Sequence, residues 1–252
     1  ASDEPVKFRI GPISGSARGM NYATKEGWLE LKSELNAEFR PTEQLPVRIT
    51  AARARFDKEK QEVTLGGPVT VSQENRRAEA AFATIFLDAR NRITRAAFEG
   101  PVHASQQSES AQLSASAGKL AAEFDTEAES LRSAVSEGNV EVESQREGRV
   151  SRLNAQKVEV AFAGKASQAQ DGTASGGVRI SQEATPSVGA ARRQGISAGG
   201  IPASRKELTA DAVRFNFQAE GRSLKDAATL GAGKLVLLPP DLKAGERIVT
   251  AG

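Results

Sequence analysis

Residues 49–71, ITAARARFDKEKQEVTLGGPVTV, contain the pattern that decides the fold. Within residues 63–71 every second residue is apolar or glycine, and mostly polar residues stand between them. Such a period of two places one set of side chains on each face of a β-strand. A charged turn at residues 57–61 separates this run from a shorter alternating run that ends at Phe56, so the stretch predicts two antiparallel strands. A helix is disfavoured, because Gly66-Gly67-Pro68 would break it.

Both halves of this stretch recur along the chain. The second half recurs as a Gly-x-Val signature at steps of 33, 38, 38 and 57 residues, starting at Gly67, Gly100, Gly138, Gly176 and, in a looser copy, Gly233. The first half ends in aspartate in three copies, at Asp57, Asp88 and Asp125. An upstream copy has Ser33 in the place of the glycine. About six such units, most unable to bury an apolar face alone, predict a quasi-one-dimensional β array.

The repeats define the expected organisation of the chain. We predict a single elongated domain over residues 1–252, with repeats near residues 17–50, 51–77, 78–113, 114–153, 154–182 and 206–247. Residues 183–205 have no sustained period and are rich in small residues and proline, which predicts a flexible insertion. Residues 111–124 could be helical on propensity alone, but their alignment with the repeat predicts a strand. Residues 248–252 resemble the start of a unit, so we expect the parent protein to continue.

The composition excludes several classes of protein. The 252 residues contain no cysteine, which excludes disulfides and cysteine-ligated metals and is compatible with the periplasm or the cytosol. A net charge of +2 is too small to indicate nucleic-acid binding. No apolar run approaches the roughly 20 residues of a membrane span.

No pattern in the chain indicates catalysis. His103 is the single histidine, and the alternation around it directs its side chain away from the apolar face. Metalloprotease, calcium-loop, phosphate-loop and nucleophile-elbow motifs are absent from the sequence. We therefore predict a protein that is not an enzyme and needs no metal or cofactor.

The informative feature is the apolar face that the repeats share. It is built from Val, Leu, Ile, Ala and Gly with an occasional Phe. Two interpretations are open. Either these side chains fill an ordinary core between two facing sheets, or, because large aromatics are few, they leave a groove wide enough for a fatty acyl chain. The residues predicted to contact such a lipid are Leu31, Leu35, Ala54, Phe56, Val63, Leu65, Val69, Val71, Ile85, Leu87, Phe98, Val102, Leu120, Phe124, Val140, Val142, Val158, Val160, Phe162, Val178, Ile180, Val213, Phe215, Phe217, Leu235 and Leu237.

The repeated string Ala-x-x-Ala-x-Phe-Asp followed by Val-Thr-Leu-x-Gly-x-Val-x-Val, in residues 51–71, resembles the OstA-like β-jellyroll family. That family includes the periplasmic lipopolysaccharide-transport proteins LptA and LptC and the N-terminal domain of LptD. The opening segment, residues 27–33, resembles LptC-type proteins with additional LptA-like repeats. The resemblance covers residues 17–182 well and residues 206–252 less well. It departs from the family at Ser33 and in the insertion.

The resemblance implies an all-β antiparallel jellyroll made of two facing sheets in a V. It further implies a periplasmic bridge that cradles the acyl chains of lipopolysaccharide and passes them toward the outer membrane. The expected partners are lipopolysaccharide, other OstA-like jellyrolls joined through terminal strand edges, and further copies of the chain joined head to tail. Whether the parent protein is anchored to the inner membrane by a segment outside this chain stays open. The alternatives are a structural or adhesive β-repeat protein with a filled core, or a β-helix enzyme acting on polysaccharide.

Overall fold

The computed structural model describes residues 1–10, 13–40, 45–127, 129–146, 148–164, 167–184, 205–219, 224–238 and 247–251. These residues form sixteen strands joined into one sheet, so the all-β prediction is confirmed. No helix of the described residues is long and apolar enough to cross a membrane. The strands are β1 (Ser2–Ile10), β2 (Ile13–Ala23), β3 (Trp28–Phe39), β4 (Val47–Ala51), β5 (Arg53–Asp57), β6 (Glu62–Gln73), β7 (Arg76–Leu87), β8 (Ile93–Gln107), β9 (Ala111–Asp125), β10 (Ser130–Arg146), β11 (Arg149–Ala163), β12 (Gln168–Ala184), β13 (Arg205–Phe217), β14 (Leu224–Thr229), β15 (Gly233–Leu238) and β16 (Arg247–Ala251).

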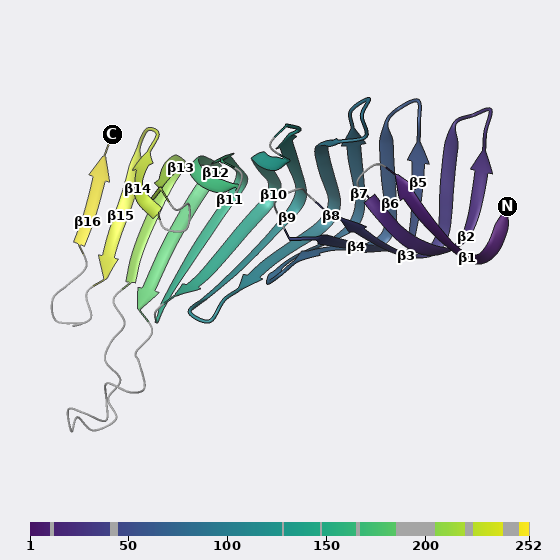
Figure 1. Cartoon of the computed structure of the whole chain (residues 1–252). Coiled ribbons are helices and arrows are strands. Elements are labelled where there is room, and N and C mark those ends of the chain that lie inside the picture. Colours follow the sequence, from purple (N-terminus) through teal and green to yellow (C-terminus); the bar gives the residue numbers. More distant parts are fainter. Residues whose placement is uncertain are drawn as a thin grey trace, which may run out of the picture.

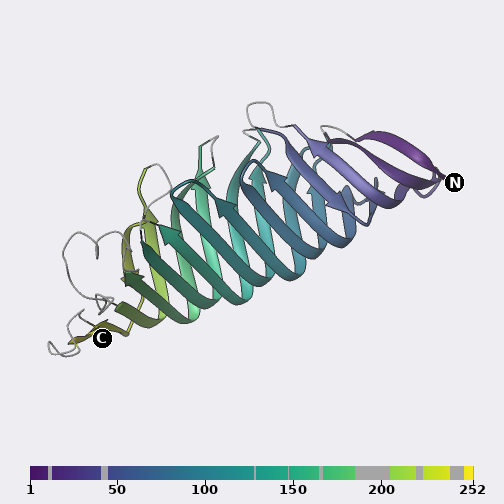
Figure 2. The ribbon, with the colours of Figure 1, turned by 90° about the horizontal axis from the view of Figure 1, so that it is seen from below.

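The strand order follows the sequence from one end of the sheet to the other, and every paired strand is antiparallel to its neighbour. Two positions in the sheet are each shared by two short strands. β4 and β5 both pair with β3 and β6, and β14 and β15 both pair with β13. The result is an elongated molecule with β1 at one end and β16 at the other (Figure 1). Seen from below, the strands cross its long axis side by side (Figure 2).

The Gly-x-Val signature marks a corner in the middle of each long strand. Gly67, Gly100, Gly138 and Gly176 have φ angles of +80° to +85°, a region that favours glycine. At each of them the register with the next strand shifts, as between Gly66 and Val69 in β6, which is the signature of a β-bulge. Bulges bend the strand that carries them, so the single sheet folds into two arms, and these arms take the place of the two predicted facing sheets.

We call the part of the sheet between the corners and the turns at residues 58–61 and 88–92 the first arm. The second arm runs from the corners to the turns at residues 74–75 and 108–110. Residues 111–124 lie in β9, as the repeat predicts, and cross both arms. Most of the predicted insertion lies outside the described residues, and at its two ends Glu183 and Arg205 pair with each other in β12 and β13.

The recurring aspartates hold the turns of the first arm. The carboxylate of Asp57 accepts a hydrogen bond from the backbone N–H of Lys60, and that of Asp125 accepts one from Glu127. Asp88 accepts hydrogen bonds from the backbone N–H groups of Arg90 and Arg92, both at 2.8 Å, and from Nε of Arg92 at 2.7 Å. An aspartate that bonds the backbone two to four residues ahead stabilises a tight turn, which explains why three repeat units end in this residue.

The hydrogen bonds at Asp88 predict a pH-dependent stability. They hold the pKa of Asp88 below its usual 3.8, with the backbone hydrogen bond from Arg92 as the largest cause. A carboxyl group with a pKa lowered by folding stabilises the protein above its unfolded pKa and loses that effect as the pH falls through its folded pKa. We expect Asp88→Ala to lower the melting temperature at pH 7 and to cost progressively less below pH 3.8. A cost that stayed constant from pH 7 to pH 2 would contradict this account.

The buried apolar residues form two clusters. The larger runs from β2 to β7 and contains, among others, Leu65 and Ala83, whose exposed fractions are 2% and 1%. The smaller lies in β11 to β13 around Val178, Val213 and Phe215. Both clusters join residues of the first arm to residues of the second, so they hold the two arms together.

Candidate functional site

The second arm carries one uninterrupted apolar row on its inner face, which we call the second-arm ladder. Each member is the Cα partner of the next across neighbouring strands, so the row crosses the whole sheet. Its members are Phe8, Gly15, Ala37, Ile49, Val71, Ala78, Ala104, Ala115, Val142, Leu153, Ile180, Leu208, Leu235 and Val249. At about 4.8 Å between strands, the fourteen positions extend roughly 60 Å. No polar side chain interrupts this row.

The first arm has a matching row, the first-arm ladder, which is apolar with two exceptions. Ser136 lies between Leu120 and Val158, and Thr229 ends the row beside Val213. The members are Met20, Leu31, Ala54, Leu65, Ala83, Phe98, Leu120, Ser136, Val158, Ala174, Val213 and Thr229. The two ladders thus line the inside of the folded sheet, which we call the trough.

The corner row joins the two ladders and alternates large and small side chains. Its Cα-paired members are Leu35 with Ala51, Val69 with Ala80, Val102 with Ala117, Val140 with Ala155, and Val178 with Ala210. The valines are 1–3% exposed. Such a tight corner needs a small residue opposite each valine, and this requirement explains the alanines.

The structure places all 26 residues predicted for lipid contact on the inner side of the sheet, which is the face that carries these rows. Those of β3 to β7 are mostly buried in the larger cluster, whereas Val142, Val158 and Val160 are half-buried. Leu237 lies at the outer rim between Lys206 and Arg247. The prediction missed ladder members because it followed only the strongest copies of the repeat. On the second arm the missed members are Phe8, Gly15, Ala37, Ile49, Ala78, Ala104, Ala115, Leu153, Leu208 and Val249, and on the first arm they are Met20, Ala83, Ser136, Ala174 and Thr229. Counting outward from each polar turn would have found them.

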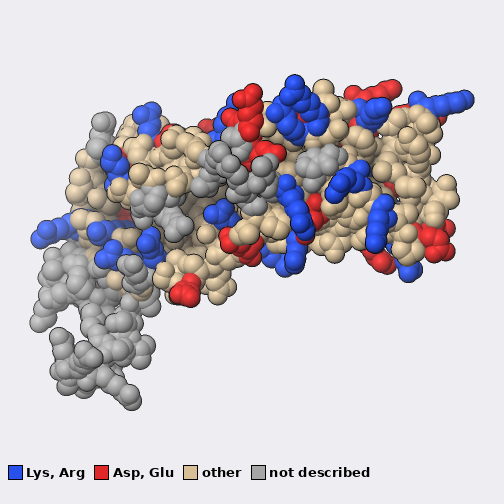
Figure 3. Space-filling model, viewed as in Figure 1, with Lys and Arg blue, Asp and Glu red and all other residues tan. Residues whose placement is uncertain are grey.

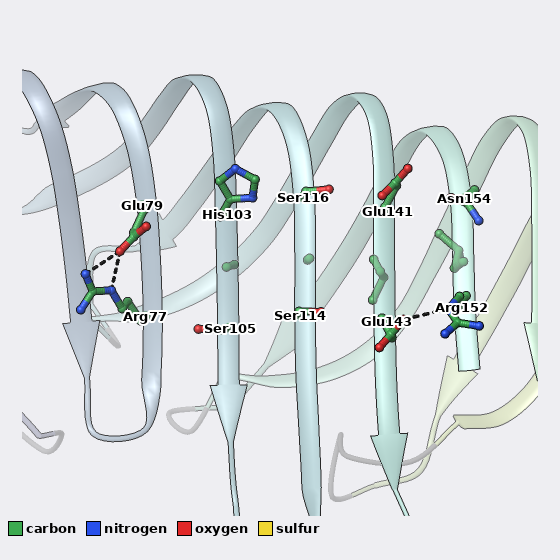
Figure 4. A pocket seen from close by; sticks show the side chains of 14 residues that line it. Arg77, Glu79, His103, Ser105, Ser114, Ser116, Glu141, Glu143, Arg152 and Asn154 are labelled. Carbon is green, nitrogen blue, oxygen red and sulfur yellow. Dashed lines mark hydrogen bonds and ion pairs between the residues drawn. The ribbon is translucent and has the colours of Figure 1, made fainter. Parts of the chain in front are cut away.

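The outer face of the second arm contains an open hollow of about 660 Å³ (Figure 4). One row along it contains Glu79, His103, Ser116, Glu141 and Asn154, which are paired across strands β7 to β11. His103 is exposed here, on the side predicted from its alternation. Among the described residues, no group of three His, Asp or Glu side chains is placed to hold a metal ion. The hollow lies on the back of the second-arm ladder, and the ladder members Ala104, Ala115, Val142 and Leu153 line it together with the polar row.

Ion pairs cross the outer face of the second arm on both sides of this hollow. Arg77 donates to Glu79 at 2.6 Å, and Arg152 donates to Glu143 at 2.8 Å. Arg205 lies 3.5 Å from Glu183 and connects the strands that flank residues 185–204. Charged side chains of both signs are interspersed over the face seen in Figure 3. These pairs are solvated, so each is worth at most about 1 kcal/mol and they favour the observed register more than they stabilise the fold.

Comparison with known proteins identifies part of this architecture. Residues 48–133 match the family described as LptA/(LptD N-terminal domain) LPS transport protein. The chain contains a segment similar to the OstA-like lipopolysaccharide-transport proteins. This OstA-like segment runs from β4 into β10 and includes the corner glycines Gly67 and Gly100. The resemblance predicted from the repeats is thereby confirmed.

Among solved structures, the chain is similar to LptH, the LptA-homologous periplasmic component of the lipopolysaccharide-transport device of Pseudomonas aeruginosa. The two are 17% identical, with a TM-score of 0.37 over 48% of this chain and 80% of LptH. No curated protein matches the chain.

Proposed function

We propose that the protein is a non-enzymatic periplasmic conduit that holds the acyl chains of lipopolysaccharide in the trough and passes them along it toward the outer membrane. The observation that carries the proposal is the unbroken second-arm ladder, in which all fourteen positions are apolar or glycine. The match of residues 48–133 to a lipopolysaccharide-transport family supports it.

The physical advantage of such a conduit is that it keeps alkyl chains out of water. Exposing an acyl chain costs about 0.8 kcal/mol per methylene group, hence roughly 10 kcal/mol for a chain of 12 to 14 carbons. A smooth aliphatic wall removes this barrier without requiring tight binding at any point. Because the residues of the second-arm ladder have no side-chain hydrogen-bond donors, no directional contact along that wall has to break at each step of movement. The energy for directional transport would come from elsewhere.

The proposed partners join at the outermost strands. β1 and β16 each pair with one neighbour among the described residues, and an unpaired strand edge can recruit another strand. Since the fourteen positions of the sheet alternate in direction, β1 of a second jellyroll would lie antiparallel to β16. Phe8 of that jellyroll would then continue the ladder after Val249. The same geometry serves other OstA-like proteins and head-to-tail copies of this chain.

A pair of neighbouring positions on β11 tests the conduit. Leu153 is a half-buried member of the second-arm ladder, and Asn154 next to it points to the opposite, outer face of the strand (Figure 4). We expect a benzophenone amino acid at Leu153 to capture lipopolysaccharide on irradiation, and the same group at Asn154 to capture little or none. Equal capture at the two positions would count against the proposal.

A structural β-repeat protein with a filled core is the second candidate, and the tightly packed cluster of β2 to β7 favours it. This alternative predicts that native mass spectrometry of the purified protein finds no lipid and that added lipopolysaccharide does not bind. Stoichiometric lipid that dissociates only on unfolding would exclude it.

A further inference from the structure

The trough differs along its length. In β1 to β7 its walls pack against each other, and the cavity left between them has a volume of only about 30 Å³. Its lining is entirely apolar and includes Phe8, Leu31, Ile49 and Leu65. A volume of this size holds about one water molecule, whereas even benzene needs a cavity of roughly 150 Å³. The protein's own side chains therefore fill this part of the trough.

In β9 and β10, between the two buried clusters, no ladder residue belongs to either cluster or is packed against it. The two buried clusters end at Leu87 and begin again at Ala155, and neither includes a residue of β8 to β10 among its buried members. The ladder residues of these two strands are only partly buried, and they are Ala115 and Val142 on the second arm and Leu120 and Ser136 on the first arm, with Ser136 the single polar one. Apolar side chains that face inward and remain accessible to solvent mark a part of the trough that is not filled from within.

Small side chains widen this part of the trough on both walls. Ala78, Ala104 and Ala115 are consecutive in the second-arm ladder. On the first arm, the row next to the ladder contains Ala96, Ala122 and Ala134 on neighbouring strands. At the equivalent places in the packed part stand Ile49 and Val71 on the second arm and Phe56, Val63 and Ile85 on the first arm. The change from large to small residues coincides with the change from packed to half-exposed walls.

We propose that an alkyl chain enters the trough between β8 and β11, and that the packed side chains of β1 to β7 close the N-terminal part to it. This inference rests on the proposed function and adds to it a fixed place of entry and a closed end. An alkyl chain is the occupant that fits, because the accessible wall is aliphatic apart from Ser136, continuous across strands and without a charged side chain in either ladder. Passage beyond β7 then requires the two arms to separate at the larger cluster.

Photolabelling of the whole chain tests the inference. A dodecanoyl lipid that carries a diazirine at the end of its chain is irradiated with the protein, and labelled tryptic peptides are quantified by mass spectrometry with and without competing lipopolysaccharide. We expect competable label in peptides from residues 93–163 to exceed that in peptides from residues 13–87 by about tenfold, equivalent to 1.4 kcal/mol. Equal competable labelling of both regions would overturn the inference and leave the conduit standing. No competable label anywhere would overturn both.

A matched pair of variants on β9 sharpens the test. Ala115→Phe places a large ring in the half-exposed part of the trough, while Ser114→Phe places the same ring on the outer face of the same strand. We expect Ala115→Phe to lower competable labelling about tenfold because the added ring occupies the space of the alkyl chain, and Ser114→Phe to leave it unchanged. Equal labelling in both folded variants would overturn the inference. Should Ala115→Phe fail to fold, the map of the unaltered protein still decides.

Discussion

Leu65→Ala is expected to destabilise the N-terminal part of the molecule by about 3 kcal/mol, within the 2–5 kcal/mol that such truncations cost in packed cores. Leu65 is 2% exposed in the larger buried cluster, between Ala54 and Ala83 of the first-arm ladder. Both neighbours are too small to close the space that the leucine would leave. The loss should therefore include the cost of a cavity as well as the lost burial.

The single tryptophan provides the measurement for this variant. Trp28 lies on β3, which pairs with β5 in the same region, and the Arg55 guanidinium stacks 4.7 Å above the centre of its ring. Urea unfolding followed by Trp28 fluorescence should thus report on this cluster. Thr64→Ala is the control, because Thr64 precedes Leu65 and its exposed side chain points outward; its effect should stay within about 0.5 kcal/mol. Equal losses in the two variants would show that Leu65 is not packed as described.

Gly67→Ala is expected to destabilise the protein by about 3 kcal/mol, through two separate causes. The φ angle of Gly67 is +80°, which costs a residue with a Cβ about 1–2 kcal/mol. In addition, a Cβ on Gly67 would lie 2.4 Å from the Cβ of Ala52, so the corner of β6 or the junction of β4 and β5 would have to move. Urea unfolding followed by Trp28 fluorescence measures the sum of the two effects.

Two further variants separate these causes. Gly177 also has a positive φ, +74°, but a Cβ there would meet nothing within 4 Å, so Gly177→Ala should cost only about 1 kcal/mol. Ala52→Gly removes the clashing methyl group, so the double variant Ala52→Gly with Gly67→Ala should lose less than the sum of the single changes. Strict additivity in this pair would contradict the close approach at the corner. For Gly177→Ala, circular dichroism is the suitable probe, because Trp28 is remote from β12.

The sequence predicted the strands and the inner face well because both depend on local alternation. The period of two in residues 63–71 determines which side chains share a face, and the polar turns determine where the chain reverses. The aspartates Asp57, Asp88 and Asp125 were visible as a pattern, and their role became clear only from the hydrogen bonds that they accept.

The corners could not be predicted in the same way. A glycine such as Gly67 in an alternating run indicates a bulge, a turn or a close approach equally well, and only the register of β6 with β7 distinguishes these. For this reason one folded sheet was predicted as two facing sheets. The sequence also did not predict which parts of the trough are packed and which are half-exposed. This difference depends on which rows of the two arms meet across the fold, and local alternation does not encode such contacts.

The order of the strands has a consequence for how the molecule can be built and rebuilt. Because the strands lie in the sheet in the order of the sequence, hairpins can be added one after another during synthesis, without waiting for a distant segment to close the structure. An open-ended array of this kind has no closure condition, unlike a barrel, in which the number of strands fixes the diameter. Gene duplication or deletion of one hairpin would lengthen or shorten the protein by about 10 Å while leaving every other contact intact. The length of the molecule along its long axis can thus change in evolution in steps of one hairpin.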